Sequence, residues 1–173
     1  MVNSKATNPS LRFVVLNLDN FKLYSDLIEE SEKIYPESIR TDIIDYKDII
    51  STSDAIAFVA FVDDEYVGNI IGGNPTEIDM QEVGMKLPVN HQEIIYIYNL
   101  IIVPVHQGKG YGVDLMTEFI KHSKKTGYKF ITGNFRNNGS YRIAKKFNPV
   151  IEAPSNNWEG SGEDFIYCAF DIR

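Results

Sequence analysis

The sequence has little of what several protein classes require. Its 173 residues contain a single cysteine, Cys168, so an internal disulfide is excluded, and this usage is typical of a reducing cytoplasm. No apolar run approaches the ~20 residues that cross a membrane. The amino terminus also lacks the basic and then apolar order of a signal peptide. We therefore expect a cytoplasmic protein that stays out of the membrane.

Histidine and cysteine are scarce as well, and acidic residues outnumber basic ones by 24 to 17. Three scattered histidines and one cysteine show no metal-ligand spacing, so no metal is predicted. The formal net charge of −7 disfavours nucleic-acid binding, because phosphate backbones attract basic surfaces, but it is compatible with a cationic substrate. The length suits a single domain over residues 1–173, large enough to bury its own core.

The most informative stretch is a long apolar run followed by glycines and an amphipathic segment. Residues 94–103 are rich in Ile, Val and Tyr without polar alternation, which predicts a strand buried on both faces. Pro104 should end its pairing, and Gly127 should end the helix that follows the glycines. A glycine loop at a helix N-terminus presents free backbone N–H groups, which is a favourable place for phosphate.

Three kinds of phosphate loop compete for this stretch. A P-loop requires Ser or Thr after Gly-Lys, and Lys109 is followed by Gly110. A dinucleotide fold requires G-x-G-x-x-G and a later acid, but the glycines here are spaced G-x-G-x-G and the next strand, residues 130–133, has no acid. The third pattern is Q-x-x-G-x-G, formed by Gln107, Gly110 and Gly112.

This third pattern resembles the pyrophosphate loop of the GNAT superfamily of N-acetyltransferases, which follows a strand ending L-x-V-x-P. Here the strand ends at residues 100–104, with Ile102 in place of the valine. The resemblance implies that acetyl-CoA binds along the strand end and the loop. The residues that it assigns to the cofactor are Leu100, Ile101, Ile102, Gln107, Gly108, Lys109, Gly110, Tyr111, Gly112 and Val113.

A second family signature, N-x-x-S-x-x-[VL]-x-E-K-x-G-[FM], is partly present in residues 137–149. In relatives its Asn and Ser contact coenzyme A, which implies the same for Asn137 and Ser140. Many members place a tyrosine seven residues after the Asn, as the acid that protonates the leaving thiolate, but this chain has Ala144 there. We hypothesise that Tyr141, one helical turn earlier, supplies this acid.

The remaining patterns predict the order of the elements. They indicate a first strand at residues 13–16, helices from Asp19 to Pro36 and over 41–50, a hairpin over 55–73, a long loop at 74–92, a strand at 128–135, a helix at 141–147, a weak strand near Val150, a loop at 152–163 and a final strand at 165–172. Together with the resemblance, this order predicts an α/β fold: a GNAT-like mixed, mostly antiparallel sheet with a splayed central strand and helices on both faces.

The first two helices are rich in acidic residues. We interpret these as solvated outer faces or, alternatively, as an acidic rim that attracts an amine and frames the acceptor site together with the loops at 74–92 and 152–163. They are Asp26, Glu29, Glu30, Glu32, Asp42, Asp45 and Asp48.

The chemistry of acetyl transfer defines what the site must contain. A lysine-like amine with a pKa of ~10.4 is mostly protonated at pH 7, and converting it to the neutral form costs roughly 4–5 kcal/mol. A base must therefore remove a proton. Relatives often use a Glu on the central strand; here the candidates are Glu93, Tyr98 and Asn99. By the same resemblance, backbone N–H groups near Leu100 and Ile102 should polarise the thioester carbonyl.

The sequence thus favours an acetyl-CoA-dependent N-acetyltransferase that acts on a primary amine of a small molecule or a protein. A non-catalytic acyl-CoA-binding module is the alternative, because the base and acid positions depart from the family pattern. A nucleotide-binding regulatory domain is a third possibility. The sequence leaves the acceptor open, and it is equally compatible with a monomer and a homodimer.

Overall fold

A computed structural model describes residues 11–77, 80 and 90–173, and these form one seven-stranded sheet with helices on both faces. The strands are β1 (Arg12–Val15), β2 (Ile56–Val62), β3 (Glu65–Gly73), β4 (Ile94–Ile102), β5 (Phe130–Arg136), β6 (Ile151–Ser155) and β7 (Phe165–Asp171). Their order across the sheet is β1-β2-β3-β4-β5-β7-β6. Only β4 and β5 are parallel neighbours, so the predicted mixed, mostly antiparallel sheet is confirmed.

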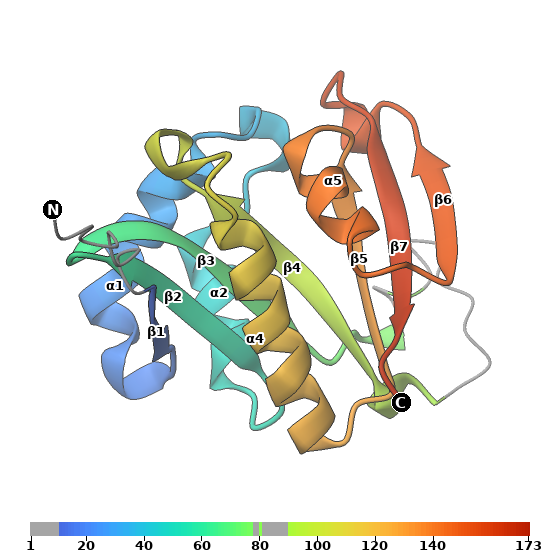
Figure 1. Ribbon diagram of the computed structural model, residues 1–173, viewed down its shortest axis with the longest axis horizontal. Helices are drawn as coiled ribbons and strands as arrows, with labels where there is room; N and C mark the ends of the chain where they lie inside the picture. Colours follow the sequence, from blue (N-terminus) through green and yellow to red (C-terminus); the bar gives the residue numbers. More distant parts are fainter. Residues whose placement is uncertain (1–10, 78–79, 81–89) are drawn as a thin grey trace, which may run out of the picture.

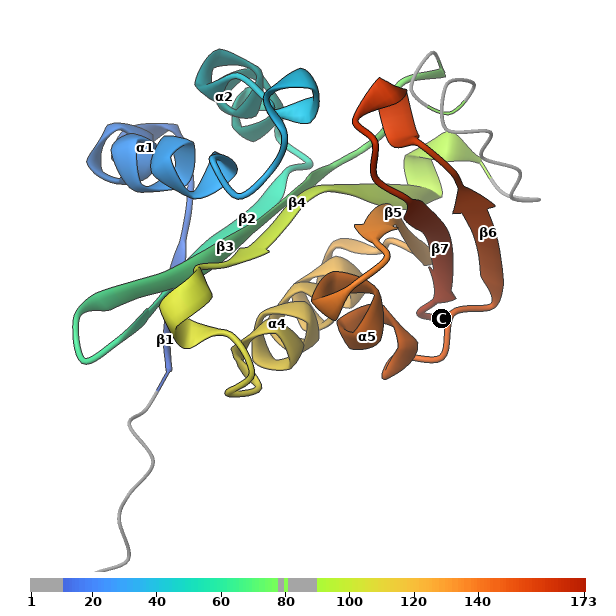
Figure 2. The same ribbon diagram turned by 90° about the horizontal axis from the view of Figure 1, so that it is seen from above.

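The four longest described helices cover the two faces in pairs, as Figure 2 shows. They are α1 (Leu18–Glu32), α2 (Ile43–Ser51), α4 (Tyr111–Thr126) and α5 (Gly139–Lys145). Helices α1 and α2 lie on one face, and α4 and α5 lie on the other. Most of the loop expected at 74–92 lies outside the described residues.

Local sequence signals account for several element boundaries. The first helix begins two positions earlier than expected, because Asn17 rather than Asp19 is its N-cap and shares a reciprocal capping box with Asn20. The hairpin turn has Asp63 and Asp64 at φ 48° and 65°, which matches the right-handed twist of β2 and β3. Gly127 ends α4 in the left-handed conformation, at φ 98°, as predicted.

The core has one cluster under each pair of helices and a third, smaller cluster that contains Tyr96, Phe130 and Tyr167. Ile95 and Ile97 of β4 pack on the α4 side together with Phe119, whereas Tyr96 and Tyr98 lie on the opposite face. Strand β4 is therefore buried on both faces, which explains its nearly uninterrupted apolar sequence.

A β-bulge interrupts the β3–β4 ladder at the middle of the sheet. Ile71 pairs with Asn99 and Gly72 pairs with Ile97, so Tyr98 is an extra residue. A bulge shifts the alternation of side chains by one position. Beyond Tyr98 the even-numbered residues of β4 turn toward α4 and the odd-numbered ones toward α1 and α2.

Candidate active site

Strands β4 and β5 separate in the middle of the sheet. They pair only from Ile94 to Ile97, opposite Phe130 to Gly133, while β4 continues to pair with β3 as far as Ile102. In Figure 1 the two strands start side by side and move apart along their length. The splayed central strand predicted from the sequence is therefore confirmed.

Two residues of β4 direct their backbone groups into this opening. The Val103 N–H donates to the Val67 carbonyl at 2.9 Å, and alternate residues of an antiparallel strand face the same neighbour. Leu100 and Ile102 consequently face away from β3, toward the side that β5 has left. The contact of Gln107 agrees with this direction, because its side-chain Nε2 donates to the Ile102 carbonyl at 2.9 Å.

The glycine loop joins the end of β4 to helix α4. Gly108 and Gly110 have φ values of 76° and 92°, which suit glycine, and Gly110 is the N-cap of α4 without a side-chain cap. Gly112 has a different reason for being glycine, because a Cβ there would lie 2.3 Å from Cδ1 of Ile143. It allows α4 and α5 to pack closely, while the first two glycines shape a turn that exposes backbone N–H groups.

A cavity of about 510 Å³ opens over this loop, and we call it the loop cavity. Three cationic side chains line it, from Arg136, Arg142 and Lys146, and such groups suit phosphate. Ten residues assigned to the cofactor from the sequence also line it: Leu100, Ile101, Ile102, Gln107, Gly108, Gly110, Tyr111, Gly112, Val113 and Ser140. Lys109 and Asn137 are exposed and are not among its lining residues, whereas Asn138 is.

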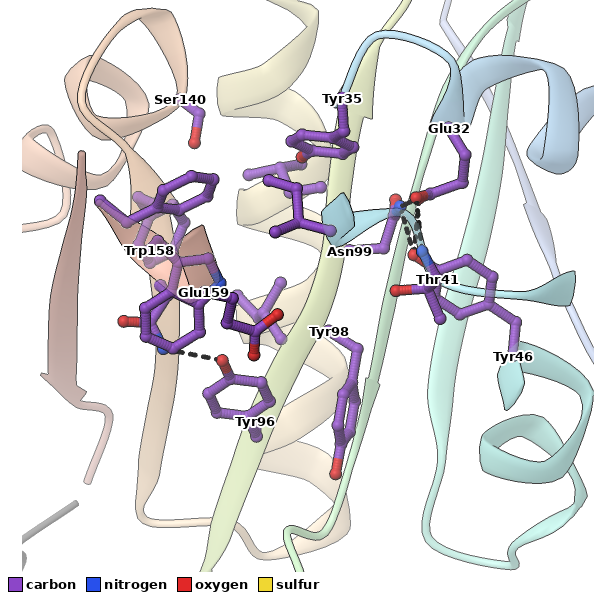
Figure 3. A pocket seen from close by; sticks show the side chains of 16 residues that line it. Glu32, Tyr35, Thr41, Tyr46, Tyr96, Tyr98, Asn99, Ser140, Trp158 and Glu159 are labelled. Atoms are coloured by element: carbon purple, nitrogen blue, oxygen red, sulfur yellow. Dashed lines mark hydrogen bonds between the residues drawn. The ribbon is translucent and has the colours of Figure 1, made fainter. Parts of the chain in front are cut away.

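A second cavity, of about 220 Å³, lies on the α1–α2 side, and we call it the tyrosine cavity. Its aromatic wall contains Tyr35, Tyr46, Tyr96, Tyr98 and Trp158. Figure 3 shows Trp158 and Glu159 on one side, Glu32 and Tyr46 on the other, and Tyr98 between them. Part of the acidic first helix and part of the 152–163 loop therefore meet here.

The two cavities adjoin at the opening between β4 and β5. Both are lined by Tyr35, Leu100 and Ser140. Leu100 also directs its backbone groups into the opening. A ligand that extends along the loop cavity would therefore reach the tyrosine cavity at Leu100.

The four catalytic candidates from the sequence occupy different places. Tyr98 and Asn99 line the tyrosine cavity. Glu93 forms an ion pair with Lys129 where β4 begins and lines neither cavity.

Tyr141 also lies outside both cavities. Its hydroxyl donates to the Glu152 carboxylate on β6, which raises the pKa of this tyrosine, and Lys145 approaches the same carboxylate at 3.2 Å. We therefore leave Tyr141 out of the chemistry proposed below.

Glu32 is a functional candidate that the sequence groups with the acidic residues of the first helix but does not identify as a buried group. The sequence places it either on a solvated face or on an acidic rim of the acceptor site, without singling it out. Its side chain is buried, with 3% of the residue exposed, and it lines the tyrosine cavity. The helical pattern contained the signal, since Glu32 lies four residues after the fully buried Ile28 and so falls on the same face. The sequence signal for Glu32 is an acidic residue at a position where the helical pattern calls for an apolar one.

Two absences hold for the described ranges, 11–77, 80 and 90–173. No group of three or more His, Cys, Asp or Glu side chains in these ranges is arranged to hold a metal ion. In the same part of the chain, no helix has the length and apolar character to span a membrane.

Solved structures with a similar fold share little sequence with this chain. NAA60 from Arabidopsis thaliana in complex with acetyl-CoA has a TM-score of 0.69 at 16% identity, over 94% of this chain and 99% of that one. The ribosomal-protein-S18-alanine N-acetyltransferase of Escherichia coli has a TM-score of 0.67 at 13% identity, over 94% of each chain. A chimera of the spermidine N-acetyltransferase SpeG from Vibrio cholerae has a TM-score of 0.65 at 14% identity, over 94% and 95%.

The sequence itself identifies the family. A comparison with curated proteins finds no match. The model of the Acetyltransferase (GNAT) family, however, matches residues 20–148, which include β4, the glycine loop and helix α5. The chain therefore belongs to the GNAT family of acetyltransferases.

Proposed function

We propose that this protein is an N-acetyltransferase that transfers the acetyl group of acetyl-CoA to a primary amine by direct attack on the thioester. The observation that supports this most is the meeting of the two cavities at Leu100, in the opening between β4 and β5. One cavity offers a phosphate-binding loop and cations, and the other offers room for an acceptor.

The loop cavity has the groups that coenzyme A requires. Backbone N–H groups from Gly108 to Gly112 would hold the pyrophosphate at the start of α4, where the helix dipole is positive. The Gln107 N–H already donates to the Pro104 carbonyl. Arg142 and Lys146 add positive charge around the pyrophosphate, whereas Arg136 also forms an ion pair with Glu163. Bound acetyl-CoA would supply the activated acetyl group.

Leu100 would orient and polarise the acetyl carbonyl. Its backbone N–H faces the opening, because the odd-numbered residues on either side of it direct their backbone N–H and C=O groups toward β3. A fixed donor stabilises the negative charge that develops on oxygen during attack, and it needs no reorganisation to do so.

The tyrosine cavity would receive the acceptor amine. Among the described residues that line it, Glu32 and Glu159 are carboxylates and none is Lys or Arg. Aromatic faces and carboxylates both attract cations. The residues that line the tyrosine cavity therefore favour a positively charged amine over an anionic acceptor. The similar structures include enzymes named for a ribosomal-protein alanine and for spermidine, so the shared fold leaves the choice of amine open.

A direct assay tests the proposal. The protein is mixed with acetyl-CoA and a panel of primary amines that includes diamines, aminoglycosides, amino acid amides and peptides, and thiol release is followed while products are identified by mass spectrometry. We expect acceptor-dependent thiol release with at least one cationic amine.

Binding without transfer is the second candidate function. The tyrosine that many family members use as an acid is replaced by the buried Ala144, which favours a module that binds acyl-CoA and leaves it intact. Tight binding of acetyl-CoA in calorimetry, with no product from any amine, would support this function and contradict the transferase.

A further inference from the structure

Glu32, the last residue of α1, places a buried carboxylate in the wall of the tyrosine cavity. Acidic side chains are almost never fully buried unless they are paired. Among the described residues no Lys, Arg or His lies within ion-pair distance of Glu32. The carboxylate is instead held by neutral donors, an arrangement that costs stability whenever the group is charged.

Three donors fix the orientation of this carboxylate, as Figure 3 shows. The hydroxyl of Tyr46 on α2 donates to Oε1 at 2.6 Å, and Nδ2 of Asn99 on β4 donates to the same oxygen at 2.5 Å. The backbone N–H of Thr41 donates to Oε2 at 3.1 Å. These bonds come from three separate segments, so the carboxylate has one defined position beside β4.

A chain of buried polar groups lies behind Asn99 and fixes it in turn. Its Oδ1 accepts from Nδ2 of Asn69 on β3, and Oδ1 of Asn69 accepts from the hydroxyl of Tyr66 and from Ser31. Asn99 directly precedes Leu100, whose N–H faces the opening. The carboxylate of Glu32 is thus linked through one side chain to the strand position where the thioester carbonyl would lie.

The surroundings of Glu32 shift its pKa in two opposing directions, and the upward shift is the larger. Burial raises its pKa above the ordinary value for a glutamate. The hydrogen bonds from Tyr46, Thr41 and Asn99, and the positive charge of Arg40, oppose this rise.

In the part of the chain that the structure describes, burial raises the pKa of three tyrosines, at positions 35, 46 and 66, and the charge of Glu32 also raises it. These tyrosines therefore stay neutral near pH 7. A carboxylate with a raised pKa is a stronger base than an ordinary glutamate and so is better suited to accept a proton.

We propose that Glu32 is the proton acceptor for the attacking amine, an inference that rests on the transferase function proposed above. The acceptor ammonium loses two protons during transfer. The first goes to the Glu32 carboxylate and from there to solvent, which leaves the nitrogen lone pair free to attack. The nitrogen–carbon bond then forms, the carbon–sulfur bond breaks, and the second proton ends on the departing sulfur.

A purely structural role for Glu32 predicts something different. In that case the carboxylate would only tie α1 to α2 and β4, and its replacement would change stability and leave the pH dependence of turnover as it is. Glu32→Gln separates the two roles, because glutamine keeps the size and an acceptor oxygen but cannot take up the proton.

The decisive measurement is kcat against pH at saturating acetyl-CoA and acceptor, since kcat reports groups that titrate in the bound complex. For wild type we expect kcat to fall at acidic pH as Glu32 becomes protonated, and we call this fall the acidic limb of the pH profile. Glu32→Gln should lower kcat by roughly 10²-fold or more and abolish this limb, with little change in the KM for acetyl-CoA. Glu30→Gln is the matched control, because Glu30 lies on the same helix with an exposed side chain, and it should behave like wild type.

Tyr46→Phe provides a second variant that does not remove the carboxylate. The Tyr46 hydroxyl donates to the charged form of Glu32 and lowers its pKa, so its loss should move the acidic limb to higher pH. Thermal denaturation of each variant shows whether it is folded at the assay temperature.

Two results would overturn the inference. If Glu32→Gln keeps the wild-type limb, or if Tyr46→Phe leaves the limb where it is, Glu32 is not the proton acceptor, although the transferase function stands. If wild type releases no thiol with any amine, the proposed function fails and the role of Glu32 fails with it.

Discussion

Tyr98 and Asn99 are neighbours in a strand, yet both side chains lie on the same face of the sheet. In a regular strand they would point to opposite faces. The bulge opposite Ile71 and Gly72 makes Tyr98 an extra residue, so that both side chains line the tyrosine cavity. Asn99 is thereby buried against Glu32 and Tyr46, while Leu100 turns its side chain toward α4.

The glycine loop can be tested with two glycines of the same helix. Gly110 precedes α4 and Gly127 follows it, with φ values of 92° and 98°, and a Cβ at either position would meet nothing within 4 Å. Changing either to Ala should therefore cost a similar stability, about 1–2 kcal/mol. Only Gly110→Ala places a methyl group in the loop cavity, so it alone should weaken acetyl-CoA binding, by roughly tenfold or more in calorimetry. Equal affinities for the two variants would contradict the assignment of the loop.

Tyr141→Phe tests the acid hypothesis drawn from the sequence. Because the Tyr141 hydroxyl is bonded to Glu152 outside both cavities, we expect the variant to keep kcat within about twofold of wild type. The change removes an exposed contact, so stability should shift by about 0.5 kcal/mol or less. A fall in kcat of roughly 10²-fold, with an unchanged KM for acetyl-CoA, would instead return the hydroxyl to the chemistry.

The pH dependence of stability gives a test of Glu32 that needs no substrate. Because its pKa is raised in the folded protein, the folded state binds this proton more tightly than the unfolded state does. Wild type should therefore lose stability as the pH rises from the ordinary glutamate pKa through the raised one, and Glu32→Gln should not. Each tenfold difference in proton affinity is worth about 1.4 kcal/mol.

Urea denaturation of both proteins from about pH 4 to 8 measures the difference between their free energies of unfolding, in which the other carboxylates cancel. A difference that stays constant with pH would show that the carboxylate titrates normally.

Cys168 should be chemically inert in the folded protein. The thiol is fully buried on β7, and burial raises its pKa to about 12, so at pH 8 the reactive thiolate is on the order of 10⁻⁴ of the population. We expect a disulfide reagent to label it at least about 100-fold more slowly than in denaturant. The protein would then add no background to a thiol-release assay. Rapid stoichiometric labelling of the native protein would mean that β7 opens readily.

The sequence was sufficient for features that depend on neighbouring residues. Glycines that can adopt positive φ, at Gly110 and Gly127, define the start and the end of α4. Ten of the twelve residues assigned to the cofactor line one cavity, because a strand end and the loop that follows it must lie together in space. The hairpin and the order of strands and helices were predicted for the same reason, since their hydrophobic patterns repeat over short distances.

The chemistry at the acceptor side was decided by contacts between distant parts of the chain. Glu32 and Asn99 are separated by 67 positions, and only the packing of α1 against β4 brings them together. The bulge that turns Asn99 inward depends on the register between β3 and β4. The hydroxyl of Tyr141 on α5 donates to the Glu152 carboxylate on β6. Sequence patterns indicate which face of an element is buried because that depends on local periodicity. Which polar groups meet within the buried region depends on register and helix packing, and only the tertiary structure determines those.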